Sequence, residues 1–367
     1  MPDGPLRVAL LFGGRSAEHE VSLRSARSVF EAMDKRRYEP LPILLTREGA
    51  WYRRPAEIGS FEDCPSLREE DRILASPDPS HGGFRHVSEK DRPGPIRVDV
   101  VFPVLHGPYG EDGTVQGLLE LADIPYVGCG VLASAVGMDK VLMKAAFRDA
   151  GLEIAPFFWF LRSEWRHDQE RILARLGQST FPVFVKPANM GSSVGITRVE
   201  HPSGFRSAVD LAARYDRKIV VEDGITGREI EVSVLGNDEP QASVPGEIVS
   251  HSEFYDYQEK YIHDTAELMI PAVLPTEQEE ATRSAAVTAF KAVDGAGLAR
   301  VDMFVTPEGR VIVNEINTLP GFTSISMYPK LWEASGLPYD KLIDRLIELA
   351  LERHRDKQNT ATDRSTQ

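Results

Sequence analysis

The sequence RVDMFVTPEGRVIVNEIN, residues 300–317, is the stretch that decides the fold. Two strand-like apolar runs, 300–305 and 310–317, flank the four residues TPEG, whose proline and glycine are typical of a turn. The pattern therefore predicts a β-hairpin. Its two strands carry polar residues in positions where apolar side chains are the rule.

These polar residues are Asp302 on the first strand and Glu315 and Asn317 on the second. Side chains two apart on a strand point to one face, so Glu315 and Asn317 can share a ligand, and Asp302 can join them across the hairpin. Oxygen donors without Cys or His suit Mg²⁺ or Mn²⁺, which commonly bridge nucleotide phosphates. A solvated acidic face is the alternative, but an unpaired carboxylate inside an apolar run is costly.

The N-terminal third of the chain predicts an α/β domain with a parallel sheet. An apolar run at 8–12 stops at Gly13-Gly14 and is followed by a helical pattern at 21–33, which is the opening of a βαβ unit. The continuous apolar run at 98–105 is typical of a strand buried on both faces. Further elements expected in this domain are strands at 40–45 and 125–127 and a helix at 114–121. We interpret the polar residues 53–95 as a long surface excursion with one short helix near 67–74.

Strands and helices alternate through the rest of the chain. The predicted strands are 181–187, 196–199, 218–222 and 229–236, and the predicted helices are 139–150, 205–215 and 276–295. A last helix has an apolar face made of Leu342, Ile343, Leu346, Ile347 and Ala350. Residues 354–367 are polar, and we expect them to be frayed.

The loop KPANMGSSVGI, residues 186–196, places Lys186 at a strand end beside a run of small residues. Small residues let backbone N–H groups approach phosphate oxygens, and the lysine adds a point charge. Because the lysine precedes the glycines and no helix follows, the loop is not a Walker A motif; it predicts a glycine flap across a hairpin. A plain tight turn is the alternative.

Two acids flank a hinge in IVVEDGITGREIEV, residues 219–232. Glu222 ends one strand and Glu229 opens the next, so the hinge between them could read an adenine edge and an acid could hold ribose hydroxyls. Acids beside strands are more often simply solvated.

Two loops of the N-terminal domain carry candidate polar groups. Glu18 lies at the opening of a helix in GGRSAEHEVS, where it either stabilises the helix dipole or holds an amine. His106 in HGPYGEDG follows a buried strand at its carboxyl end, where open α/β sheets bind ligands. Residues 251–264 are rich in tyrosine and lack a regular period, which indicates a lid or a patch that covers the core.

Length and composition exclude several classes of protein. The chain has 367 residues, enough for two or three domains, and a net charge of −14, which disfavours nucleic-acid binding. No apolar run approaches the roughly 18 residues of a membrane span, and the start lacks a signal-peptide pattern. Two cysteines cannot form a disulfide framework. We expect a cytoplasmic α/β protein.

Taken in order, seven motifs resemble one family. GGRSAEHEVSLRSA, LHGPYGEDGT, GMDKVLMK, FPVFVKPANMGSSVGI, FYDYQEKYI, GLARVDMF and NEINTLPGFTSISMYP are similar to D-alanine–D-alanine ligases of the ATP-grasp superfamily. The resemblance implies an ATP-grasp fold behind a Rossmann-like N-terminal domain of the biotin-carboxylase type. It implies domains at 1–137, 138–229 and 230–352 and a polar tail at 353–367.

The resemblance also implies site residues, position by position. Those for ATP are Lys140, Lys186, Ser193, Glu222, Ile225, Glu229 and Lys260. Those for catalysis are Glu18, Ser192, Tyr261, Arg300 and Gly321. Those for two Mg²⁺ or Mn²⁺ ions are Asp302, Glu315 and Asn317. Those for two D-alanine molecules are Glu18, His106, Ser326 and Met327.

The implied reaction makes D-alanyl-D-alanine for peptidoglycan synthesis through a D-alanyl phosphate. Two related reactions are alternatives, in which D-lactate or D-serine replaces the second D-alanine. Tyr261 within EKY favours formation of the dipeptide D-alanyl-D-alanine. A non-catalytic ATP-binding protein on this fold would be expected to lack a metal ligand or Arg300, and all are present. The resemblance further implies a homodimer through the N-terminal domain.

Overall fold

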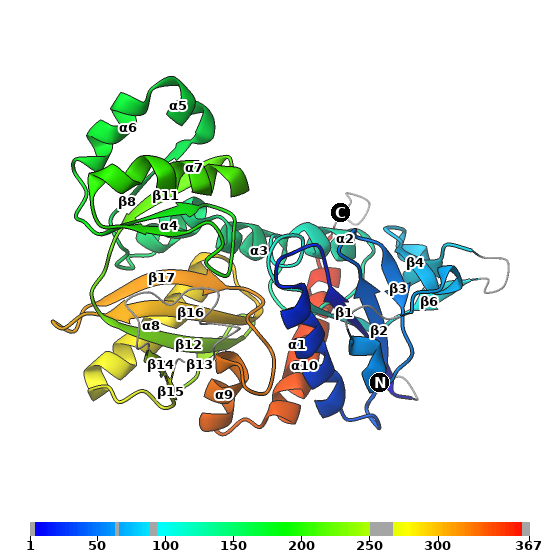
Figure 1. Ribbon diagram of the computed structural model, residues 1–367. Helices are drawn as coiled ribbons and strands as arrows, with labels where there is room; N and C mark the ends of the chain where they lie inside the picture. The colour runs from blue at the N-terminus through cyan, green and yellow to red at the C-terminus, as the bar shows by residue number, and fades with distance from the viewer. Residues whose placement is uncertain (1–3, 63–65, 89–93, 250–266, 362–367) are drawn as a thin grey trace.

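The computed structural model describes residues 4–62, 66–88, 94–249 and 267–361. Within these ranges the chain forms three sheets, one in an N-terminal domain and two that face each other in the rest of the molecule (Figure 1). The predicted lid, with Lys260 and Tyr261, lies in 250–266, outside the described residues.

The N-terminal sheet has the strand order β6-β5-β4-β3-β2-β1-β7. Its strands are β1 (Leu6–Gly13), β2 (Tyr38–Leu45), β3 (Trp51–Arg53), β4 (Arg72–Ala75), β5 (Gly83–His86), β6 (Pro95–Arg97) and β7 (Val100–Val104). Strands β2, β1 and β7 are parallel, as predicted, and the segment 125–127 adds a single parallel bridge, Val101 to Tyr126. The helices are α1 (His19–Ala32), α2 (Thr114–Leu121) and α3 (Val131–Met138). Apolar residues of α1 and of α2 cover opposite faces of this sheet.

The expectation for residues 53–95 is wrong. Strands β3 to β6 extend the sheet by antiparallel pairing instead of forming a surface excursion, and the helix expected near 67–74 is one 3-10 turn at Glu69–Asp71 followed by β4. Ile73 and Phe84 bury their side chains against the sheet. Strands of three or four residues are too short to show a period in the sequence.

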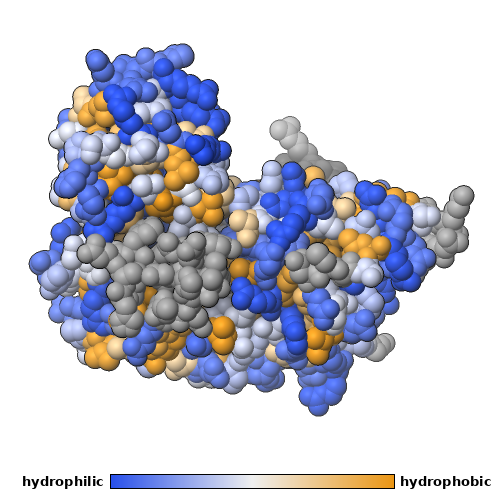
Figure 2. All heavy atoms as spheres, viewed as in Figure 1, coloured by the Kyte–Doolittle hydropathy of each residue, from blue (hydrophilic) through white to orange (hydrophobic). Residues whose placement is uncertain are grey.

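The central lobe is built on the antiparallel sheet β10-β9-β11-β8. Its elements are α4 (Lys140–Asp149), β8 (Phe157–Leu161), α5 (Arg162–His167), α6 (Gln169–Leu176), β9 (Val183–Pro187), β10 (Thr197–Val199), α7 (Phe205–Tyr215) and β11 (Lys218–Asp223). Helices α5, α6 and α7 cover one face of the sheet and form a lobe that projects from the molecule, with a largely hydrophilic top (Figure 2). The predicted flap joins β9 to β10.

The C-terminal part is built on the sheet β15-β14-β12-β16-β17, in which β13 pairs with β12. Its elements are β12 (Arg228–Gly236), β13 (Gln241–Ala242), β14 (Gly246–Val249), β15 (Glu267–Met269), α8 (Thr276–Ala292), β16 (Gly297–Val305), β17 (Val311–Asn317), α9 (Met327–Ala334) and α10 (Tyr339–Gln358). Helix α8 packs on the sheet. The predicted hairpin β16–β17 is confirmed, and Asp302 lies opposite Glu315 next to a bulge.

Helix α10 returns to the N-terminal domain. The apolar face that the periodicity predicted is confirmed, and it packs beside α1 and β7 within one core (Figure 1). The expected fraying from residue 354 is wrong, because α10 continues to Gln358. Arg353 donates to the carbonyl of Tyr126, and Lys357 pairs with Glu120 of α2.

Leu346→Ala tests this contact. Leu346 is fully buried on α10, so the change should lower the free energy of unfolding by about 2–5 kcal/mol. Its neighbour Arg345 is half-buried and pairs with Glu352, whose side chain is 48% exposed, so Arg345→Ala should cost less than about 1 kcal/mol. Urea unfolding of the two variants measures both values, and equal losses would contradict the packing described here.

Candidate active site

The first of two adjoining pockets lies between the two antiparallel sheets. Its volume is about 480 Å³, and it is lined by α4, β9, the flap, β11, β12, β14 and β17. The described residues that the sequence suggested for ATP all line it: Lys140, Lys186, Ser193, Glu222, Ile225 and Glu229. Its size and its lysines suit a nucleotide with its phosphates.

A chain of buried charges forms one wall of this pocket. Lys186 donates to Glu222 Oε2 at 2.5 Å, and Lys144 of α4 lies 3.2 Å from Glu222 Oε1. Burial alone would raise the pKa of Glu222, but the two lysines lower it to about 2. The Glu222 carboxylate therefore orients Lys186. Sequence reasoning missed fully buried Lys144, although it is the last residue of the quoted motif GMDKVLMK.

The second pocket, of about 310 Å³, lies between the N-terminal domain and the hairpin. The residues suggested for substrate and catalysis that line it are Glu18, His106, Ser192, Arg300, Gly321, Ser326 and Met327. It shares Gly191, Ser192, Ile248 and Glu315 with the first pocket. The two pockets therefore adjoin at the flap and at Glu315.

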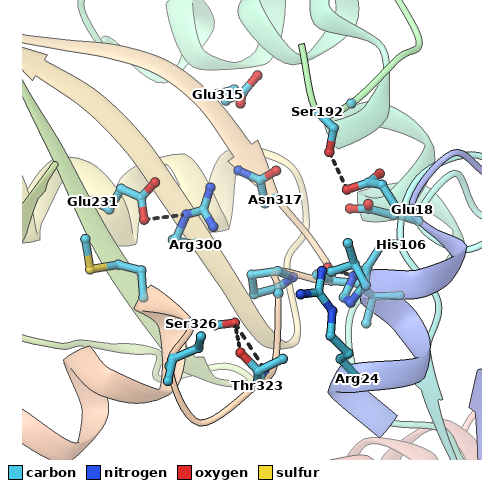
Figure 3. A pocket seen from close by; sticks show the side chains of 18 of the residues that line it. Glu18, Arg24, His106, Ser192, Glu231, Arg300, Glu315, Asn317, Thr323 and Ser326 are labelled. Atoms are coloured by element: carbon cyan, nitrogen blue, oxygen red, sulfur yellow. Dashed lines mark hydrogen bonds and ion pairs between the residues drawn. The ribbon is translucent and has the colours of Figure 1, made fainter. Parts of the chain in front are cut away.

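The flap reaches the N-terminal domain through Glu18. Glu18 is the residue before α1, and its carboxylate accepts a hydrogen bond from Ser192 Oγ (Figure 3). Ser192 and Ser193 have φ of +49° and +59°, a left-handed conformation that non-glycine residues rarely adopt. Such conformations concentrate at ligand-binding sites.

His106 is held as a neutral ring beside Glu18. Its Nδ1 lies 3.0 Å from the carbonyl of Leu319, so Nδ1 carries the proton, and Nε2 accepts from Ser25 Oγ at 3.2 Å. Burial lowers the pKa of His106, although the charge of Glu18 opposes that shift. His106 therefore positions the loop of Leu319 and adds no charge to the pocket.

Glu111 is a pocket residue that the sequence prediction missed. It lies in the quoted motif HGPYGEDG, and its Oε1 accepts from the amide of Gly107 at 2.5 Å. Desolvation and the charge of Glu18 raise the pKa of Glu111 to about 8. Near neutral pH, Glu18 is therefore the principal negative charge at this end of the pocket. The position of Glu111, an acid within a glycine-rich loop, is the feature of the sequence that could have identified it.

The opposite end of the pocket is the start of α9. Ser326 precedes the helix, and its Oγ contacts the amide of Thr323 at 3.1 Å and the hydroxyl of Thr323 at 2.8 Å. The N-terminal end of a helix favours a carboxylate. Arg24 of α1 lines the same pocket and adds a positive charge (Figure 3). Sequence reasoning missed Arg24 and Thr323.

The hairpin forms the wall between the two ends. Arg300 contacts both oxygens of Asp302 at 2.7 Å, and Asn317 Nδ2 donates to Asp302 Oδ2 at 3.0 Å. Glu231 of β12 lies 3.0 Å from Arg300 Nε. The sequence offered a signal for Glu231, because it lies two residues from Glu229 on one strand.

The donor set of the hairpin fits a hard cation. In the described part of the chain, no three His, Cys, Asp or Glu side chains form a metal-binding group. Mg²⁺ bound with a nucleotide takes only one or two carboxylates from protein and completes its shell with phosphate and water. Asp302, Glu315 and the Asn317 amide satisfy that requirement: Glu315 lines both pockets, Asn317 lines the second, and Asp302 lies behind them, bonded to Asn317.

Two antiparallel sheets face each other around a lysine-lined pocket, and the parallel-sheet domain beside them supplies an acid. This arrangement defines an ATP-grasp ligase. Family models described as D-ala D-ala ligase N-terminus and C-terminus match residues 7–129 and 146–348. The chain belongs to the D-alanine–D-alanine ligase family. The predicted family, fold and enzyme class are confirmed, and ATP use follows from the family.

Proteins similar to this chain match it over nearly its whole length. The D-alanine–D-alanine ligase of Heliobacterium modesticaldum is 51% identical over 97% of this chain and 98% of its own. The structure of the ligase from Coxiella burnetii has a TM-score of 0.85 and 39% identity, covering 97% of this chain and 96% of its own. The D-Ala:D-Ser ligase VanG from Enterococcus faecalis has a TM-score of 0.84 and 40% identity, covering 94% and 99%.

No helix among the described residues combines the length and the apolar character that a membrane crossing requires.

Glu111→Gln tests the protonation of the pocket. The pKa of Glu111 in the folded chain lies above the ordinary 4.5, so its stabilising effect is complete below about pH 4.5 and is lost as pH rises through about 8. From pH 5 to pH 9 the Tm of the wild type should therefore fall relative to that of Glu111→Gln. Thermal melts over this range measure the difference. Parallel curves would contradict it, and exposed Glu352→Gln is the control.

Proposed function

We propose that this enzyme joins two D-alanine molecules to D-alanyl-D-alanine, a peptidoglycan precursor, through a D-alanyl phosphate formed with ATP. The observation that carries the proposal is the polarity of the second pocket. Glu18 lies at one end, the start of α9 at the other, and the nucleotide pocket adjoins between them at Glu315. This arrangement suits two zwitterionic amino acids beside the phosphates of ATP.

The chemistry requires activation of a carboxylate. A carboxylate is a poor acyl donor until one oxygen becomes part of a leaving group, and phosphorylation achieves this. Lys140 and Lys186 line the nucleotide pocket, where their charges would stabilise the transferred phosphoryl group. Ser193 of the flap adds backbone contacts to phosphate, and Ile225 and Glu229 hold the adenine and ribose end.

Asp302, Glu315 and Asn317 would hold two Mg²⁺ or Mn²⁺ ions. When bound, these ions supply neutralisation of phosphate charge. The protein's own contribution is a buried, oxygen-rich wall with Asp302 fixed by Arg300 and Asn317.

The remaining roles follow from the two ends of the substrate pocket. Glu18 takes the ammonium of the first D-alanine, and His106 holds the loop beside it. Ser326 and the Met327 amide, with Arg24 nearby, take the carboxylate of the second. Among the described side chains, those of the hairpin β16–β17 would contact the negatively charged oxygen of the tetrahedral intermediate.

The groups proposed for the second chemical step lie on the hairpin, at Gly321 and on the flap. Arg300 and the backbone of Gly321 stabilise the oxyanion that forms when the second amine attacks the acyl phosphate. Ser192 links Glu18 to the flap. Lys260, proposed for ATP binding, and Tyr261, proposed for catalysis, lie outside the described residues.

A second candidate is ligation of D-alanine to D-serine, because the similar VanG structure is titled a D-Ala:D-Ser ligase. The pocket wall near α9 favours D-alanine. Ile248, Leu268 and Met327 line it, and the hydroxyls of Thr323 and Ser326 contact each other. A methyl group fits this wall without leaving a hydroxyl unpaired.

Substrate choice can be measured directly. Phosphate release from ATP should be fastest with D-alanine and at least about tenfold slower when D-serine is offered with limiting D-alanine, since one unpaired hydroxyl costs about 1–3 kcal/mol. D-lactate, which has a hydroxyl in place of the attacking amine, should also react more slowly. L-alanine is the stereochemical control. Mass spectrometry identifies the product, and a dominant D-alanyl-D-serine product would replace the main proposal with the second candidate.

We also propose that the enzyme works in the cytoplasm, where ATP is supplied, and as a homodimer through the N-terminal domain. Leu121, Val131 and Leu132 support the dimer, since these large apolar side chains are exposed on α2 and α3, which contact each other.

Leu132→Glu should convert the dimer to a monomer, because a charge in an apolar interface is costly to bury. Leu132 is 59% exposed, so the fold should tolerate the change. Light scattering after size-exclusion chromatography measures the mass. Leu142→Glu, an exposed apolar residue on α4, is the control, and an unchanged mass in Leu132→Glu would exclude this face.

A further inference from the structure

Arg300 contacts two buried carboxylates at once. Asp302, two residues along the same strand, takes Nε and Nη2 in a bidentate pair at 2.7 Å. Glu231 reaches Nε from the neighbouring strand β12 at 3.0 Å (Figure 3). Glu231 and Asp302 are direct partners in the β12–β16 ladder, so the backbone register places both acids at the guanidinium.

Asp302 has further polar neighbours besides Arg300. Both Asp302 oxygens receive hydrogen bonds, Oδ1 from Arg300 and Oδ2 from Arg300 and Asn317. Asp302 also lies opposite Glu315 in the hairpin, on the side of the proposed metal ions. These three hydrogen bonds leave one of the four acceptor sites of the carboxylate open. A metal ion bound there would compete with the Arg300 guanidinium for the negative charge of Asp302.

Competition of this kind would leave a buried arginine without a counter-ion. Arg300 side-chain atoms are 16% exposed, and Glu231 and Asp302 are 3% and 4% exposed. Removing the partner of a buried charge is strongly unfavourable. A metal-binding aspartate in contact with a buried arginine therefore needs a second acid beside that arginine.

We infer that Glu231 is the permanent counter-ion of Arg300, which frees Asp302 for the metal ions while the guanidinium stays at the wall of the substrate pocket. This inference rests on the proposed metal-binding role of Asp302. Glu231 is a positioning residue, since it acts through Arg300 and Asp302. Without it, Arg300 would hold Asp302 more tightly and metal binding would require more Mg²⁺.

Binding of ADP, measured by calorimetry, tests this without turnover. Glu231→Gln keeps the size of the side chain and removes its charge. The Mg²⁺ concentration for half-maximal enhancement of ADP binding should rise about tenfold, and ADP affinity in EDTA should stay within twofold. The kcat should fall about tenfold or more, with little change in the KM for ATP. Asp344→Asn, which also removes a buried acid paired with an arginine (Arg37) but lies far from the site, should change none of these.

Glu231→Asp separates direct contact from a general effect of negative charge. The shorter side chain keeps its charge but withdraws from Arg300, so direct contact predicts a Mg²⁺ requirement raised as in Glu231→Gln. A wild-type Mg²⁺ requirement in Glu231→Asp, or in Glu231→Gln, would overturn the inference.

A double-variant comparison shows whether Glu231 acts through Asp302. In an Asp302→Asn background, Glu231→Gln should produce no further rise in the Mg²⁺ requirement; an additive rise would overturn the inference. If Asp302→Asn alone leaves the Mg²⁺ requirement unchanged, the metal assignment in the proposed function fails instead. Near-native circular dichroism and melting curves establish that each variant is folded.

Discussion

Buried charges paired across neighbouring elements are the interaction on which this site depends. Glu222 of one sheet pairs with Lys186 of the same sheet and with Lys144 of α4, and Glu231 and Asp302 pair with Arg300 on the other sheet. A charge placed in a protein interior is tolerated only with such a partner. The pairs therefore fix the cations at defined points of both pockets before any ligand is present, which lowers the reorganisation needed during reaction.

Helix α4 and the flap connect these charges to the rest of the chain. Lys144 of α4 contacts Glu222 on β11 and also donates to the carbonyl of Asn314 on β17, at 3.3 Å. Asn314 is the extra residue at the bulge of the hairpin, so one buried lysine contacts both sheets. The flap contacts the N-terminal domain through Ser192 and Glu18. The two pockets are thus held together by a few polar contacts between separate domains.

The sequence predicted the parts of the structure that depend on local pattern. The hairpin at 300–317, the parallel strands at 8–12 and 98–105 and the glycine flap are visible because each has a strong period or turn signal within a few residues. Their positions also brought Asp302, Glu315 and Asn317 together, since strand spacing and turn length set the register.

Other parts depend on contacts between distant segments and could not be predicted in this way. Glu231 meets Arg300 only because β12 pairs with β16 in one particular register, and Lys144 is buried only because two sheets enclose α4. The strands β3 to β6 were missed because pairing with the sheet edge, rather than their own sequence, makes them strands. A polar tail was expected after residue 353, but side chains such as Lys357 bond to a surface that the sequence pattern does not show.

The return of α10 to the first domain has a consequence for biosynthesis. The core around β1, α1 and β7 includes Leu342, Leu346 and Leu349, which leave the ribosome only after both other domains have been made. Domains usually fold in the order of translation, but here the part of the apolar face that α1 does not cover stays exposed until α10 has been made. The nascent chain therefore exposes this part of the sheet for most of its translation.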